Sequence, residues 1–230
     1  MRRRPTVPDL LRGGHFPPPA AVAKICDRAL GRRMLQMVWD AFDDVAPALS
    51  LIDWTQGIDD VERGVTEVLE TALQQRWRAA GGFPPFHVKH EAYEYESRSA
   101  PPARPPQYDI AFRLNDDERV MWPLEAKAIA DDRDTSANLK DYIDTVRDRF
   151  LTGYYAPFSN GGAMLAFLRS GDPTTLLTAV AGRLQTTLAP SSDFPSRDHR
   201  VSTHVRRIPA GKPYQRDFEC HHLVMPLSAT

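Results

Sequence analysis

The sequence is poor in cysteine and has no long apolar run. Only two cysteines, Cys26 and Cys220, occur in 230 residues, and they lie far apart, so no disulfide framework is expected. The basic N-terminal stretch has no apolar signal-peptide core, and no later run of about 18 apolar residues could cross a bilayer. These absences exclude disulfide-stapled secreted domains and membrane-spanning proteins, and they predict a soluble protein of the reducing cytoplasm.

The chain also lacks an excess of charge of one sign. With 29 Lys and Arg against 30 Asp and Glu its formal charge is -1, so any contact with nucleic acid has to come from local patches. Neither GxxxxGKS nor GxGxxG is present, which argues against an ATPase. The "ECHH" segment puts His221 and His222 on opposite faces of a strand and has no second ligand pair at finger-like spacing, so zinc is not predicted.

Apolar periodicity predicts an α/β fold with an N-terminal helical extension. The extension covers residues 1–55, with helical spacing from Ala20 to Leu49, and residues 56–230 form the main domain. Its predicted elements, in order, are a helix from Ile58 to about residue 80, strands at 86–97, 108–114 and 120–129, a helix at 136–151, a strand at 161–169, a helix starting at Pro173 with Asp172 as N-cap, and a C-terminal β-hairpin of strands 200–208 and 218–227. This order predicts a mixed central sheet flanked by helices.

The helix that begins at Ile58 carries several acids. Its predicted apolar stripe consists of Ile58, Val61, Val65, Val68, Leu69, Ala72 and Leu73. At about 100° per residue, Glu62 borders this stripe, whereas Glu67 and Glu70 point to solvent. Glu62 is therefore the acid of this helix that can approach the sheet.

The stretch "VMWPLEAKAIA", residues 120–130, places two charges in an apolar strand. Side chains alternate along a strand, so Glu125 and Lys127 emerge on one face and Leu124 and Ala126 on the other. An acid two residues before a lysine is weak as a motif, because 30 acids and five lysines in 230 residues give about 0.65 such pairs by chance. Pro123 indicates an edge strand or a bulge, and a surface salt bridge on such an edge is the alternative to a functional pair.

A second acid in the preceding strand strengthens the functional interpretation. Asp109, in "YDIAF", can meet Glu125 across the sheet because adjacent strands lie about 4.8 Å apart. Two converging carboxylates repel each other, and a Mg²⁺ ion relieves that repulsion. Lysine is scarce in this chain, and an ammonium suits a site where a water has to be oriented or charge at phosphorus stabilised.

Together, the element order from Ile58 to Leu188, the acid in "YDIAF" and the "EAK" motif resemble the PD-(D/E)xK, or restriction-endonuclease-like, nuclease superfamily. The resemblance implies a restriction-endonuclease-like core and metal-dependent endonuclease activity. By matching positions, it implies that Asp109 and Glu125 bind Mg²⁺, with Mn²⁺ as a substitute, that Lys127 assists the attacking water, and that Glu62 joins the metal site. The chain departs from the family pattern at Tyr108, where the family has proline.

The expected substrate is nucleic acid, with DNA favoured over RNA. The segment from Arg197 to Arg216 has a local excess of basic residues, of which Arg200, Arg206, Arg207 and Lys212 are candidates for phosphate contacts; a solvated charged hairpin is the alternative. Tyr142 and Arg149, on the helix after the motif, are candidates to approach the site, although core packing is favoured for Tyr142. No DNA-reading module is recognisable, so a partner protein or a homo-oligomer is expected to supply recognition.

By analogy at the level of fold, the protein resembles effectors of prokaryotic restriction or anti-phage defence. Two alternatives stay open. One is a catalytically silent copy of the fold that serves as a binding or structural subunit of a larger complex. The other is a nuclease of repair or recombination.

Overall fold

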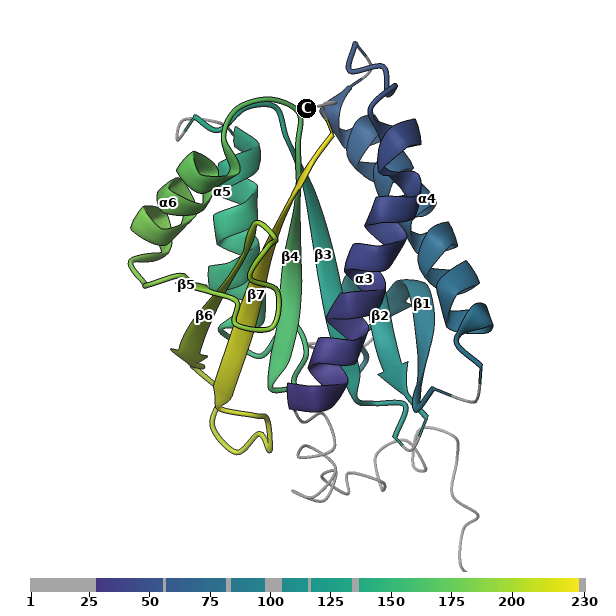
Figure 1. The fold of residues 1–230 in the computed structure, drawn as a ribbon. Coiled ribbons are helices and arrows are strands. Elements are labelled where there is room, and N and C mark those ends of the chain that lie inside the picture. Colours follow the sequence, from purple (N-terminus) through teal and green to yellow (C-terminus); the bar gives the residue numbers. More distant parts are fainter. Residues whose placement is uncertain are drawn as a thin grey trace, which may run out of the picture.

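A computed structural model describes residues 28–55, 57–81, 84–97, 105–115, 117–133 and 137–227. Within these residues the fold is α/β, with two helices followed by a seven-stranded mixed sheet and interspersed helices (Figure 1). The start of the first predicted helix at Ala20, Cys26, and the start of the predicted helix at Ser136 lie outside the described residues. No helix in the described part of the chain is both long enough and apolar enough to cross a membrane.

The strands lie in the order β1-β2-β3-β4-β7-β6-β5. Strands β1, β2 and β3 form an antiparallel meander, β3, β4 and β7 are parallel neighbours, and β6 and β5 complete the sheet by antiparallel pairing. The bounds of the strands are Phe86–Tyr93 (β1), Gln107–Leu114 (β2), Met121–Ile129 (β3), Gly161–Leu168 (β4), Ala189–Pro190 (β5), His199–Val205 (β6) and Asp217–Pro226 (β7). The predicted hairpin of β6 and β7 is confirmed, but β7 also pairs with β4, so the hairpin is built into the sheet.

Helices cover both faces of the sheet (Figure 1). Helices α3 (Arg28–Leu49) and α4 (Ile58–Ala79) pack on one face. Helix α5 (Ala137–Asp144), its π-helical continuation η1 (Thr145–Phe150) and helix α6 (Pro173–Leu184) pack on the other. As predicted, Pro173 is the first residue of α6, and the Asp172 carboxylate caps it by accepting from the Thr175 amide at 2.8 Å.

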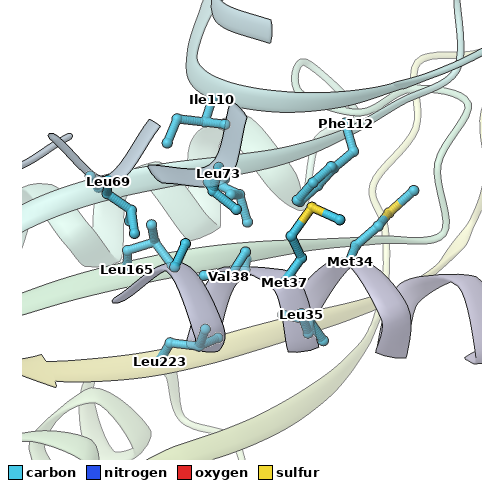
Figure 2. Packing of buried hydrophobic residues seen from close by; sticks show 14 of the residues in the cluster. Met34, Leu35, Met37, Val38, Leu69, Leu73, Ile110, Phe112, Leu165 and Leu223 are labelled. Atoms are coloured by element: carbon cyan, nitrogen blue, oxygen red, sulfur yellow. The ribbon is translucent and has the colours of Figure 1, made fainter. Parts of the chain in front are cut away.

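The core on the α3 and α4 side joins the N-terminal region to the sheet (Figure 2). Val38 of α3 and Leu69 of α4 are fully buried in one cluster with Phe112 of β2, Leu165 of β4 and Leu223 of β7. The helix assigned by sequence to an extension therefore shares a core with α4 and with one face of the sheet.

The apolar face of α4 differs from the predicted stripe at Val68, and Ile58 at the start of the helix is only partly buried. Val68 is 40% exposed, whereas Val65, Leu69 and Leu73 are fully buried and Thr66 is buried among them. The buried face is therefore centred between Val65 and Leu69 and turned away from Val68. Glu62 keeps its place at the border of this face and is only partly exposed, Glu67 is exposed as predicted, and Glu70 is half-buried.

The position of Pro123 corrects a second expectation. Strand β3 is the third of seven strands and not an edge. The proline is tolerated because the ladder with β4 begins only at the next residue, Leu124, which pairs with Ala163. The missing N–H of Pro123 thus lies outside that ladder.

Candidate active site

The candidate site lies where β2 and β3 separate. Their described pairing ends at Ile110 and Leu124, although β3 continues to Ile129. Two carboxylates satisfy the β3 amides beyond that point: Oδ2 of Asp109 accepts from the Ala126 N–H at 2.7 Å, and Oε2 of Glu62 accepts from the Ala128 N–H at 2.9 Å. The strand separation therefore brings an acid from β2 and an acid from α4 to the same stretch of β3.

Alternation along β3 puts the two charged residues on one face, as the sequence predicts. Leu124 and Ala126 belong to the core beneath α3 and α4, and Ile129 belongs to the core beneath α5 and α6. Glu125 and Lys127 share the parity of Ile129 and face the α5 side. On β2, Asp109 shares the parity of Ala111, which faces the same way.

Lys127 lies among the three acids. Its Nζ is 2.9 Å from Oε1 of Glu62 and 3.9 Å from Oε1 of Glu125, and its side chain is 15% exposed. Burial alone would lower the pKa of Lys127, but the carboxylates of Glu125, Glu62 and Asp109 together raise it above its ordinary value. The lysine is therefore held in its charged form.

Glu125 is the most buried acid of the site, with 4% of its surface exposed. Its Oε2 atom is fully buried and has no hydrogen-bond partner among the described residues. Burial first, and then the nearby carboxylate of Asp109, raise the pKa of Glu125 to about 8. A buried carboxylate oxygen without a donor is unfavourable unless a proton or a cation completes it.

The residues present suit a hard divalent cation held by two carboxylates. Burial is also the main cause of the raised pKa of Asp109, and the Asp109 carboxylate disfavours ionisation of Glu125. No group of three or more His, Cys, Asp or Glu side chains arranged around a metal position occurs in the described part of the chain. A pair of carboxylates is nevertheless the set that Mg²⁺ uses when water and phosphate oxygens supply its other ligands.

Glu62 reaches the site, but not as a free ligand. One of its oxygens binds Lys127 and the other accepts the Ala128 amide. Burial raises the pKa of Glu62, and the Lys127 charge opposes that rise. This arrangement gives no support to the prediction that Glu62 is a third metal ligand, and makes it the residue that positions Lys127.

Arg149 and Tyr155 complete the site from the α5 side. Nη1 of Arg149 is 3.4 Å from Oε1 of Glu125 and donates to the Tyr155 hydroxyl at 2.5 Å. Arg149 was a candidate from its helix, whereas Tyr155 follows η1 in a loop that carries no sequence signal. Tyr142 is buried in the core and is hydrogen-bonded to Nδ1 of His222 at 2.8 Å, so core packing is confirmed for it.

The "ECHH" histidines lie on opposite faces, as predicted. His222 contacts Tyr142 and Ser202 on the α5 side, whereas the His221 ring lies against Trp122 on the other side. The buried Nε2 of His199 is 3.0 Å from Nδ1 of His221. His221 is thus hydrogen-bonded to His199, and His222 to Tyr142 and Ser202, within the fold.

The four predicted nucleic-acid contacts do not form one surface. Arg200 lies on β6, three strands away from β3. Arg206 is 2% exposed, so its assignment as a phosphate contact is wrong. Its guanidinium donates to the carbonyls of Ala156 and Ser159 and lies 3.7 Å from the Phe218 ring centre, and burial lowers its pKa to about 9. Arg207 and Lys212, in the loop between β6 and β7, are exposed.

Adjacent Arg206 and Arg207 allow a matched test. We expect Arg206→Met to lower the free energy of unfolding by about 3 kcal/mol, because buried carbonyl groups lose their donors. We expect Arg207→Met to change stability by less than about 0.5 kcal/mol and to reduce the slope of log K against log salt for nucleic-acid binding by about 1. Urea unfolding and salt titrations of binding measure both. A destabilised Arg207→Met protein would contradict this division.

Comparisons of the chain with protein-family models, with curated proteins and with solved structures found no match. The chemistry of the site is therefore inferred from its own residues.

Proposed function

We propose that the protein is a Mg²⁺-dependent nuclease with a restriction-endonuclease-like core. The observation that carries this proposal is the state of the Glu125 carboxyl group. Its Oε2 is buried without a hydrogen-bond partner among the described residues, and its Oε1 lies 3.9 Å from Nζ of Lys127. Burial and the neighbouring Asp109 raise the pKa of this group. The fold assignment is supported by the order of elements along the chain: α4, the antiparallel strands β1 to β3, α5, and then β4 parallel to β3.

Asp109 and Glu125 would hold the cation. When bound, Mg²⁺ supplies charge that polarises a phosphoryl oxygen and acidifies a coordinated water. Asp109 has one oxygen committed to the Ala126 amide, which fixes the orientation of its carboxylate. Glu125 is fixed by the strand and by burial, so both acids are oriented before substrate arrives.

Lys127 has the role of orienting the attacking water and neutralising negative charge that develops at phosphorus. Glu62 holds the ammonium at 2.9 Å, which limits the positions that Nζ can take. Arg149, whose side chain is 46% exposed, is positioned to bind the substrate phosphate. Each residue thus has a separate part in phosphodiester hydrolysis.

The proposal is tested by incubating the purified protein with single- and double-stranded DNA and RNA, with Mg²⁺ and with EDTA. We expect Mg²⁺-dependent cleavage of at least one substrate, and none with Asp109→Asn. A Mg²⁺-induced rise in melting temperature that Asp109→Asn loses would support the metal site independently. Absence of both cleavage and thermal shift would favour the silent-subunit alternative, in which the acids serve only to satisfy β3 amides.

Glu62→Gln separates a positioning role from a ligand role. A glutamine keeps the shape of the side chain but weakens its hold on Lys127, so we expect cleavage to fall by about 10- to 100-fold. We expect the Mg²⁺-induced thermal shift to stay at its wild-type size, measured by differential scanning fluorimetry. If Glu62→Gln loses the thermal shift as Asp109→Asn does, Glu62 is a metal ligand after all.

A further inference from the structure

An exposed tyrosine lies beside the candidate active site. Tyr154 is 37% exposed, and its ring is nearly parallel to that of the buried Tyr155, with 6.0 Å between centroids and 11° between planes. Tyr155 in turn holds Arg149, which contacts Glu125. A continuous line of contacts therefore joins the exposed ring to the buried acid.

Tyr154 lines a hollow of about 360 Å³, which we call the tyrosine hollow. Its other lining residues are Ser97, Asp148, Thr152, Gly153, Pro209, Lys212 and Tyr214. The loop between β6 and β7 is fixed against this region because the Arg207 N–H donates to the Leu151 carbonyl at 2.8 Å. The exposed Lys212 and Arg207 thus come to the same end of the sheet as Arg149, with Asp148 as the acid in the lining.

The charged groups of the site are recessed. The Glu125, Lys127 and Glu62 side chains are 5%, 15% and 21% exposed. A flexible strand can turn a phosphate inward toward such groups more readily than a stiff duplex. The shape of the site and the exposed ring therefore favour the same kind of substrate.

We propose, resting on the proposed nuclease function, that the substrate is single-stranded nucleic acid with one base stacked on Tyr154. The Tyr154 ring packs nearly parallel to Tyr155, is 37% exposed and lines the tyrosine hollow. Bases within a duplex are stacked on each other, so only an unpaired base presents a free face to a protein aromatic ring. Lys212, which lines the same hollow as Tyr154, and Arg149, which is held by the neighbouring Tyr155, supply charge for the adjoining phosphates.

Binding in EDTA tests this inference without cleavage. Fluorescence anisotropy would compare a labelled 20-nucleotide DNA strand, the RNA strand of the same sequence, and the blunt DNA duplex. We expect at least one single strand to bind at least tenfold more tightly than the duplex. Tyr154→Ala should weaken that binding by about five- to hundredfold, the range typical of one lost base stack, and Tyr154→Trp should retain it.

An abasic strand separates stacking from a merely structural effect. Because it keeps the phosphates and lacks bases, wild type and Tyr154→Ala should bind it equally. Tyr95→Ala is the matched control, since Tyr95 is 63% exposed but is not among the lining residues of the tyrosine hollow. Duplex binding as tight as single-strand binding, a loss on the abasic strand, or an equal loss with Tyr95→Ala would overturn the inference.

Failure of the inference and failure of the nuclease proposal have different signatures. Tyr154-dependent binding of a single strand without Mg²⁺-dependent cleavage would leave the binding surface in place and remove the enzyme. Duplex cleavage that Tyr154→Ala leaves unchanged would support the nuclease proposal and overturn the single-strand inference.

Discussion

Glu125→Gln is expected to abolish cleavage and at the same time to stabilise the protein. Loss of the cation-binding carboxylate should lower the cleavage rate by at least about 10³-fold. In metal-free buffer at pH 8, removal of the buried charge should raise the free energy of unfolding by on the order of a few kcal/mol. Urea unfolding and a Mg²⁺-dependent cleavage assay measure the two effects on the same preparation.

The pH dependence of stability gives the sign of this effect. The pKa of Glu125 rises from 4.5 to about 8 on folding, so between these values the folded protein holds a proton that the unfolded chain has lost. The stability that this proton provides is complete below pH 4.5, falls as the pH rises, and is lost above about pH 8.

Glu125→Gln should flatten that fall in stability with pH, and Mg²⁺ should reverse the fall in the wild type alone. Glu67→Gln, at an exposed position of α4, should change neither activity nor the pH profile. A stability curve for Glu125→Gln as steep as that of the wild type would contradict the assignment of Glu125 as a buried carboxyl group whose Oε2 has no hydrogen-bond partner among the described residues.

Lys127→Met is expected to be inactive too, but less stable. Loss of the water-orienting ammonium should lower cleavage by about 10²- to 10³-fold. The surrounding carboxylates raise the pKa of Lys127, so the folded state favours its charge. Removing this charge leaves Glu62 without its counter-ion and leaves Glu125 with Arg149 alone, at 3.4 Å. We expect the free energy of unfolding to fall by about 3 kcal/mol in metal-free buffer.

Mg²⁺ should restore part of the stability of Lys127→Met, because both carboxylates that would hold the ion are retained. The matched control is Lys140→Met, which removes an exposed lysine paired with Asp144 one turn along α5. That variant should keep full activity and leave the urea midpoint unchanged, because an exposed ion pair contributes little to stability. If Lys127→Met instead gains stability and loses the Mg²⁺ response, the three acids do not depend on this lysine as proposed.

Local physics allowed much of the candidate site to be anticipated from sequence. Alternation along a strand fixes Glu125 and Lys127 on one face whatever the rest of the fold does, and helical periodicity puts Glu62 at the border of a buried face. The N-cap at Asp172 is likewise a contact within four residues. These relations depend on neighbours in the chain, which is why a single sequence contains them.

Long-range register could not be anticipated in the same way. Whether Asp109 would meet β3 depended on where the pairing of β2 and β3 ends, and the Asp109 bond to the Ala126 amide exists only because it ends at Leu124. Val68 and Arg206 were misassigned for a related reason. A valine at helical spacing and an arginine in a basic segment have the expected local chemistry, but the packing around them left one exposed and enclosed the other.

By itself the sequence determined the α/β class, the bounds of most helices and strands, and the face on which each charged residue of β3 lies, because these follow from the chain's local periodicity. Only the tertiary structure decided that β3 is interior, that Arg149 and Tyr155 adjoin Glu125, that Glu62 holds Lys127, and that Tyr154 lies exposed beside them. Each of these contacts joins residues that are distant in the chain or that lie in a loop without a periodic pattern. The distances between these residues depend on where β2 and β3 separate and on how the helices pack on the sheet. Neither property can be read from the residue pattern of a single helix or strand.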